Sequence, residues 1–375
     1  MSVTTLRVTT GPAPGAGAGY DVVVGHGLLN HVAAMLGPDV QRVAVCHPAS
    51  LDHLADRVAD TLGDRELLRL VLPDGEAAKS GPVALDAWER LGEAGFTRSD
   101  AVVTVGGGAT TDMGGFLAAT WLRGVRVVHV PTTLLAMVDA AVGGKTGMNT
   151  GAGKNLVGSF HEPAGVVCDL DLLETLPLAE LVAGLGEVVK CGFIADPEIL
   201  ALVEKDPGSA CDAGSSLLRE LVERAIRVKV DVVADDLRET GGRDGHPGRE
   251  VLNYGHTMAH AIERATGYRV RHGEAVALGM VYVAELARLS GLLDDATAAR
   301  HAATCRLVGL PTRFGDVGVE ARFEELLATM RVDKKARGTH LRFVVLQGMG
   351  EPTVLTDPPV EHLRAAYDVL AGATR

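Results

Sequence analysis

Four side chains of types that bind metals stand out in this chain, Glu187, His256, His260 and His272. The two histidines at 256 and 260 are four residues apart, so a helix would place both imidazoles on one face. The other two ligands would complete a site of nitrogen and oxygen donors, which suits zinc with one position open for a substrate. Such an open position would indicate catalysis. The alternative is a set of ordinary polar residues on helices.

A run of glycines, Val105-Gly-Gly-Gly-Ala-Thr-Thr-Asp112, follows a predicted strand and precedes a stretch compatible with a helix. Glycines in this position let backbone N–H groups approach a phosphate, with a helix N-terminus behind them. The spacing differs from the G-x-G-x-x-G dinucleotide fingerprint, because Thr111 holds the third glycine position. The run therefore indicates nucleotide or phosphate binding, with a tight strand-to-helix turn as the alternative.

Further polar groups follow predicted strands of the same half. Thr132 and Thr133 lie at the end of the strand 125–130, where open α/β sheets bind ligands. The segment Asp74–Lys79 follows the strand 67–72, and an acid there could accept ribose hydroxyls. Glycine-rich loops then carry a set of polar residues that could hold phosphate or carboxylate oxygens, without the spacing of a Walker loop. These residues are Asp139, Lys145, Lys154 and Asn155.

Cations and an amide also accompany the metal-type residues. Lys190 comes one helical turn after Glu187, and the segment 331–335 near the C-terminus ends in two lysines. Such groups converging on a metal would suit a polyhydroxylated substrate with several negative charges. The others, upstream of the histidine pair, are Lys229, Arg249 and Asn253.

The elements that must position these groups change character near residue 178. Before it, short β-rich runs alternate with helical patterns such as 82–95, which predicts an α/β domain over 1–177 with a mainly parallel sheet. After it, helical patterns follow one another, which predicts a helical domain over 178–375 with one strand, 341–346. The expected strands of the first domain are 20–24, 42–46, 67–72, 101–105, 125–130 and 166–168, and the expected helices of the second are 178–193, 215–238, 249–267, 273–290, 294–308 and 320–330.

The overall composition excludes several classes of protein. The net charge of −12 and an aromatic content of only 4% argue against a nucleic-acid-binding surface. Five widely spaced cysteines without a C-x-x-C pair fit reduced thiols in the cytoplasm. Neither a secretory signal nor an apolar run long enough to span a membrane is expected.

Taken together, the motifs resemble the 3-dehydroquinate synthase family of sugar phosphate cyclases, most closely its actinobacterial members. The matching stretches run from about residue 70 to residue 346, in the order of the family. They are DGEAAKS, GGGATTDMGGFLAATWLRGVR, VPTTLLAMVDAAVGGKTGMN, GKNLVGSFHEP, GLGEVVKCGFI, LNYGHTMAHAIE, RHGEAVALGMV and DKKARGTHLRFVV.

The resemblance implies an N-terminal Rossmann-like domain that binds NAD and an all-α C-terminal domain that binds a divalent metal, zinc or cobalt. The metal ligands would be Glu187, His256 and His272, which makes His260 a substrate or proton-relay residue rather than a fourth ligand. Arg123 would reach the phosphate pocket of a second copy, so a homodimer is implied. The substrate would be surrounded by Asp139, Lys145, Asn155, Lys190, Lys229, Arg249, Asn253 and one of Lys334 and Lys335. The NAD site would be lined by Asp74, Glu76, Lys79, Gly106, Gly107, Gly108, Ala109, Thr110, Thr111, Asp112, Thr132, Thr133, Lys145 and Lys154, with Leu172, Leu173, Glu174 and Thr175 at its edge.

The reaction implied by the resemblance converts 3-deoxy-D-arabino-heptulosonate 7-phosphate into 3-dehydroquinate and phosphate, in the shikimate pathway of aromatic amino acid biosynthesis. A substrate alcohol is oxidised transiently with NAD, and the neighbouring proton becomes acidic. Phosphate then leaves by β-elimination, the hydride returns, the ring opens, and an intramolecular aldol reaction closes the carbocycle. The substrate's own phosphate would take the key proton in this scheme.

One departure from the family pattern keeps related enzymes open as alternatives. Nine residues, Thr240–Gly248, separate Glu239 from Arg249, where family members usually have two or three. If this insertion bulges outward, Arg249 keeps its role through its fixed spacing to Asn253. If it folds inward, it could alter the substrate pocket, which keeps paralogous cyclases open, especially aminodehydroquinate synthase of antibiotic pathways. The 2-deoxy-scyllo-inosose and 2-epi-5-epi-valiolone synthases fit less well. A metal-dependent alcohol dehydrogenase of the glycerol-dehydrogenase type also fits less well, because it needs no phosphate pocket. A binding protein without activity is the non-enzymatic alternative.

Overall fold

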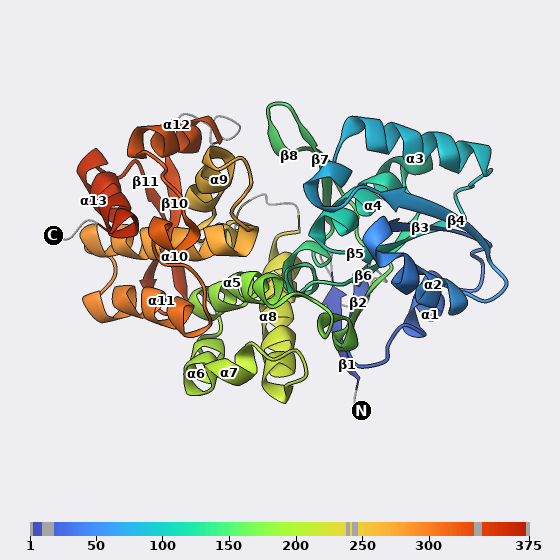
Figure 1. The fold of residues 1–375 in the computed structure, drawn as a ribbon, viewed down its shortest axis with the longest axis horizontal. Helices are drawn as coiled ribbons and strands as arrows, with labels where there is room; N and C mark the ends of the chain where they lie inside the picture. Colours follow the sequence, from blue (N-terminus) through green and yellow to red (C-terminus); the bar gives the residue numbers. More distant parts are fainter. Residues whose placement is uncertain (1–2, 10–18, 238–240, 242–246, 334–339, 373–375) are drawn as a thin grey trace. The chain divides into compact units, whose positions relative to one another are not determined.

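The computed structural model describes residues 3–9, 19–237, 241, 247–333 and 340–372, and Figure 1 shows the elements that they form. The chain makes two compact units. The first consists of Met1–Pro177 together with Lys229–Ala234, and the second of Leu178–Val228 together with Asp235–Arg375. Among the described residues, no helix is both long and apolar enough to cross a membrane.

A seven-stranded sheet forms the centre of the first unit, with strand order β1-β2-β9-β6-β5-β3-β4. All neighbouring strands run parallel except β1 and β2, which pair antiparallel. The inner strands are almost continuously apolar and buried, as expected for a parallel sheet covered on both faces. The strands are β1 (Thr4–Thr9), β2 (Gly19–Gly25), β3 (Arg42–Pro48), β4 (Glu66–Leu72), β5 (Ala101–Gly106), β6 (Arg126–Pro131) and β9 (Gly165–Asp169).

Helices connect these strands, and α4 packs most closely on the sheet. A Cβ atom on Gly114 would lie 2.3 Å from Thr104 Cγ2, and one on Gly115 would lie 2.6 Å from Thr146 Cγ2. Only glycine allows so close an approach of α4. This packing places the first residues of α4 directly after the glycine run. The helices of this unit are α1 (His31–Leu36), α2 (Asp52–Asp60), α3 (Gly81–Glu93) and α4 (Gly108–Thr120), with short turns η1 (Ala49–Leu51), η2 (Gly75–Ala78), η3 (Trp121–Arg123), η4 (Ala136–Ala140) and η5 (Leu170–Leu173).

The six strands expected in this half are confirmed, but three others were missed. One is β1, and the other two form an antiparallel hairpin, β7 (Lys145–Thr150) and β8 (Gly153–Phe160). The prediction of lysine-bearing loops is therefore wrong, because Lys145 and Lys154 lie on strands. Glycine and asparagine are rare in strands, and their abundance here hides the alternation that identifies one.

The second unit is mainly helical, and the one strand expected there, 341–346, is confirmed as β10 (Arg342–Gly348). A second strand, β11 (Glu351–Thr356), pairs with it in a hairpin and was not predicted. The helix expected over 249–267 is divided into η6 (Gly248–Asn253) and α9 (His256–Ala265), because Gly255 adopts φ +79°. Three helices were not predicted, α6 (Pro197–Lys205), α7 (Pro207–Ala210) and α13 (Val360–Ala371). The others are α5 (Leu178–Ile194), α8 (Ser216–Asp235), α10 (His272–Leu289), α11 (Asp295–Leu307) and α12 (Phe323–Asp333), with a short turn η7 (Phe314–Val317).

Candidate active site

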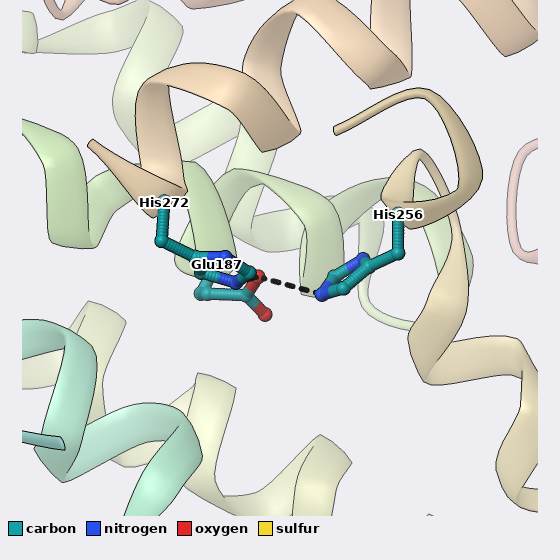
Figure 2. Close-up of side chains that lie close together, drawn as sticks. All are labelled: Glu187, His256 and His272. Atoms are coloured by element: carbon teal, nitrogen blue, oxygen red, sulfur yellow. Dashed lines mark ion pairs between the residues drawn. The ribbon is translucent and has the colours of Figure 1, made fainter. Parts of the chain in front are cut away.

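Three side chains of types that bind metals, each from a different helix of the second unit, meet at one point, as Figure 2 shows. Glu187 lies on α5, while His256 and His272 are the first residues of α9 and α10. Their ligand atoms all lie within 4.8 Å of one another, and Glu187 Oε1 is 3.4 Å and 3.5 Å from the two imidazole Nε2 atoms. Tetrahedral zinc with ligand bonds of about 2.0–2.1 Å separates its ligand atoms by about 3.4 Å. The three residues therefore fit a divalent metal.

Glycines beside each ligand allow the three helices to approach this closely. A Cβ on Gly273 would lie 1.6 Å from the Ala183 carbonyl oxygen of α5, which places His272 next to Glu187. A Cβ on Gly279 would lie 2.0 Å from the carbonyl oxygen of Gly255, the residue before α9. The backbone contacts of α10 with its two neighbours thus set the positions of all three side chains.

Replacing Gly273 with alanine is expected to separate α5 from α10 and to weaken metal binding together with stability. The new methyl group would meet backbone rather than a flexible side chain, so relief requires a helix to move. Overpacking of this kind costs about 1–3 kcal/mol or more. Denaturant unfolding and zinc titration would measure both effects. Gly315→Ala is the matched control, because a Cβ there meets nothing within 4 Å, and equal behaviour of the two variants would contradict the argument.

A buried lysine accompanies the three ligands. Lys190 is 1% exposed, forms an ion pair with Glu187 one turn before it, and donates a hydrogen bond to the Leu252 carbonyl at 2.8 Å. Burial, reinforced by this cation, lowers the pKa of His256 to about 3, so its imidazole is neutral at pH 7, as a metal ligand must be.

His272 has the opposite protonation tendency. Burial acts to lower its pKa, but hydrogen bonds with Glu187 and Glu263 outweigh burial and raise the pKa to about 10. A metal bound here would have to displace a proton from this imidazolium, so its binding would weaken as pH falls.

His260 shares α9 with His256 but does not belong to the group of three. Its side chain is exposed, and its ring centre lies 5.6 Å from that of His256 and 6.5 Å from that of His272. This geometry favours three ligands over the four that spacing alone indicated. His260 borders the site, where it can exchange protons with a bound molecule.

Arg249 and Asn253 lie in η6, between the glycine-rich insertion and the first histidine. Arg249 is fully buried, and its Nη1 donates to the Leu237 carbonyl at 2.7 Å. The Asp236 carboxylate accepts from the backbone N–H groups of Gly241 (3.1 Å) and Arg249 (3.3 Å), and so holds both sides of the insertion. Glu239, His246, Lys334 and Lys335 lie outside the described residues.

In the first unit, the glycine run and the threonine pair lie side by side. Gly106 ends β5, Gly107 precedes α4, and the Thr132 N–H donates to the Gly106 carbonyl at 3.0 Å. A Cβ on Gly107 would lie 3.2 Å from Thr133 Cγ2, so the two segments leave little space between them. Helix α4 starts at Gly108 and contains Ala109, Thr110, Thr111 and Asp112. Its first N–H groups therefore stand at the carboxyl ends of β5 and β6, where phosphates bind well.

A network of ion pairs joins the Asp74–Lys79 segment to its surroundings. Lys79 Nζ lies 2.5 Å from the Asp112 carboxylate, and Lys154 pairs with Glu76 at 3.3 Å. Glu76 also accepts from the Asn149 amide at 2.6 Å, and Asp74 accepts from Ser50 at 2.6 Å. The last two partners, Asn149 and Ser50, were not identified from the sequence. Asn149 lies in the GGKTGMN stretch, whose strand character was the missing signal.

Asp139 and Lys229, 90 residues apart, form a direct pair in the first unit. Asp139 lies in the π-helical turn η4, a conformation found often at functional sites. Lys229 Nζ donates to the Asp139 carbonyl at 2.9 Å and pairs with its carboxylate.

The remaining predicted residues of this unit lie on other elements. Lys145 is exposed on β7, and Asn155 on β8 adopts φ +55°. Arg123 is exposed in η3 with φ +69°. Leu172 and Leu173 are buried in η5, whereas Glu174 and Thr175 after it are exposed.

Comparison with known proteins gives one consistent family. The model for the 3-dehydroquinate synthase N-terminal region matches residues 69–183, and that for the C-terminal region matches residues 184–336. The 3-dehydroquinate synthase of Thermobifida fusca (strain YX) is 54% identical over 372 residues, which cover 99% of this chain and 98% of the relative.

Solved sugar phosphate cyclases share the fold at lower identity. A 2-deoxy-scyllo-inosose synthase complexed with carbaglucose-6-phosphate, NAD+ and Co2+ matches with a TM-score of 0.85 and 26% identity, covering 98% of this chain and 100% of the other. The 2-epi-5-epi-valiolone synthase of Streptomyces hygroscopicus subsp. jinggangensis 5008, with NAD+ and Zn2+ bound, matches with a TM-score of 0.85 and 26% identity, covering 97% and 99%. A probable glycerol dehydrogenase from Sinorhizobium meliloti 1021, at 21% identity and a TM-score of 0.66 over 94% of this chain and 96% of its own, shares the fold alone. By sequence identity along nearly its whole length, the chain belongs to the 3-dehydroquinate synthase family.

Proposed function

We propose that this protein is a 3-dehydroquinate synthase, which converts 3-deoxy-D-arabino-heptulosonate 7-phosphate into 3-dehydroquinate and phosphate. The observation that carries the proposal is 54% identity with a synthase along 99% of the chain. The cluster of Glu187, His256 and His272 adds a chemical reason, because it has the donor set and spacing of a catalytic metal centre.

NAD and a divalent metal, Zn2+ or Co2+, are the proposed cofactors, as in the two cyclases that share the fold. Bound NAD would accept and return a hydride, and the metal would polarise the alcohol that is oxidised. The first unit offers the α4 N-terminus for the pyrophosphate and the acids at 74 and 76 for ribose hydroxyls. Lys154 pairs with Glu76, and Lys79 pairs with Asp112 of α4, so these two carboxylates have counter-charges.

The remaining side chains are proposed to hold the substrate. Lysines and arginine bind carboxylate and phosphate as fixed charges, and the exposed His260 relays protons to or from the substrate. Lys190 lies beside the proposed metal ligands, where its positive charge can stabilise negative charge that develops on substrate oxygen atoms. The proposed substrate residues are Asp139, Lys145, Asn155, Lys190, Lys229, Arg249, Asn253, His260 and one of Lys334 and Lys335.

Product identification tests this function against that of the related cyclases. The purified protein, given NAD and zinc, is expected to release phosphate from 3-deoxy-D-arabino-heptulosonate 7-phosphate and to form 3-dehydroquinate, identified by mass spectrometry and NMR. Turnover of the amino analogue alone would instead assign the chain to an antibiotic pathway, with the insertion 240–248 as the first region to examine.

The described residues include no disulfide, which fits the proposed cytoplasmic location.

A homodimer is the proposed assembly, with Arg123 acting in the site of the second copy. Arg123 is exposed on a turn in which Leu122, Arg123 and Gly124 all have positive φ, so the backbone presents it outward in a fixed way. In the same unit, β8 exposes Leu156 (58%) and Phe160 (44%). Exposed apolar residues on a strand favour coverage by another chain.

Mixed dimers are expected to recover activity lost in each parent. Arg123→Ala and Glu187→Gln should each be nearly inactive, because each removes a different part of every site. If Arg123 acts in trans, a mixed dimer contains one site with both residues intact, and about a quarter of wild-type activity should return in an equal mixture. Sedimentation would confirm that dimers persist. Absence of recovery in mixed dimers would place Arg123 in the site of its own chain.

A further inference from the structure

A second carboxylate lies behind the metal centre and has no role so far. Glu263 is near the end of α9, it is 3% exposed, and its Oε2 lies 3.4 Å from Nδ1 of His272. Burying a carboxylate is costly unless a partner compensates for the loss of water. An imidazole N–H is such a partner, and this one belongs to a proposed metal ligand.

The geometry of His272 gives the contact a chemical meaning. Its Nε2 faces Glu187 Oε1 at 3.5 Å, so Nδ1 is the nitrogen turned toward Glu263. A metal bound at Nε2 requires the neutral imidazole with its proton on Nδ1. A carboxylate that accepts this proton's hydrogen bond selects that tautomer, orients the ring and makes Nε2 a stronger donor.

His256 is held differently, which makes the role of Glu263 distinct. Its Nδ1 donates to the backbone carbonyl of Tyr254 at 3.1 Å, a neutral acceptor. Tyr254 is itself fixed, because its hydroxyl lies 2.8 Å from Nε2 of the buried His301. Only one of the two histidine ligands therefore has a charged group behind it.

The charge balance of the centre points the same way. Glu187 pairs with Lys190, so these two residues together contribute no net charge at the metal position. Glu263, which contacts the His272 ring, places a further carboxylate close to the metal position. In a buried site, solvent and salt only weakly screen the attraction between such a carboxylate and a cation.

We propose that Glu263 is a positioning residue of the metal centre, which holds His272 through Nδ1 and raises the affinity of the site for a divalent cation. The inference depends on the proposed function only in that Glu187, His256 and His272 bind the metal. It adds a fourth residue that touches neither metal nor substrate.

Metal affinity in two variants tests the proposal. Glu263→Gln keeps the shape and an acceptor oxygen but removes the charge, and Glu263→Ala removes both. Competition with a chromogenic chelator is expected to show zinc binding about 10-fold weaker in the first and about 100-fold weaker in the second. The Co2+-loaded glutamine variant should also show altered visible absorption, because a neutral acceptor at His272 Nδ1 makes Nε2 a weaker donor to the metal. Glu285→Gln is the control, since Glu285 also lies on a helix of this unit but pairs with Arg288; its zinc affinity should match wild type.

Each outcome decides a specific point. Zinc dissociation constants within twofold of wild type in both variants, with an unchanged cobalt spectrum, would overturn the role of Glu263. If the alanine variant does not fold, the glutamine variant decides alone, with thermal unfolding of the metal-free protein as the check on its fold. A wild-type protein that binds no zinc would instead refute the metal centre itself, and with it this part of the proposed function.

Discussion

Replacing Glu187 with glutamine is expected to remove the metal and to lower kcat/KM by about 10³-fold or more. The carboxylate is the negatively charged ligand of the three, and its Oε1 faces both histidines. Loss of a metal that polarises the reacting oxygen costs several kcal/mol of transition-state stabilisation, and each 1.36 kcal/mol is a factor of ten. Metal analysis of the purified variant and steady-state kinetics would measure both effects.

The same substitution should also destabilise the protein, because it removes the carboxylate that pairs with the buried Lys190. Breaking a buried ion pair by removing one partner costs about 3–5 kcal/mol. The double variant Glu187→Gln/Lys190→Met should regain much of this stability while remaining without metal and without activity. A Glu187→Gln protein with full metal content and normal turnover would show that the ligand assignment is wrong.

Replacing Lys190 with methionine is expected to separate metal binding from catalysis. The variant should bind zinc at least as tightly as wild type, because a cation that competes with the metal for Glu187 is gone. Its kcat/KM should fall by about 10²- to 10³-fold, the usual effect of losing one donor that stabilises developing negative charge.

Zinc titration beside steady-state kinetics distinguishes this outcome from the alternatives. Loss of metal and activity together would mean that Lys190 acts only by holding Glu187 in place. Normal activity would exclude it from the chemistry. Thermal unfolding of the zinc-loaded variant serves as the control for its fold.

The sequence identified the side chains that cluster at Glu187, but not how they are arranged. A spacing of four correctly placed His256 and His260 on one helix, but it does not tell which of them faces α5 and α10. That depends on backbone contacts at Gly273 and Gly279, between segments far apart in the chain. Glu263 was missed for the same reason, because its contact with His272 joins two helices.

The parallel sheet was predictable because its inner strands are buried on both faces and almost continuously apolar. The β7–β8 hairpin was not, since its glycines and its exposed outer residues lack that pattern. The helix break before His256 depends on a single glycine with positive φ, which periodicity cannot show. The pair of Asp139 and Lys229 likewise becomes visible only in three dimensions.

The most direct test of the proposed reaction is the number of product molecules formed for each NAD molecule. Protein stripped of nucleotide, loaded with zinc and given a small, known amount of NAD, would be incubated with 3-deoxy-D-arabino-heptulosonate 7-phosphate. We expect many molecules of 3-dehydroquinate for each NAD, one phosphate for each product, and no net absorbance in the NADH band when the reaction ends. Product limited to the amount of NAD, with NADH accumulating in equal quantity, would contradict hydride return and identify the protein as a dehydrogenase.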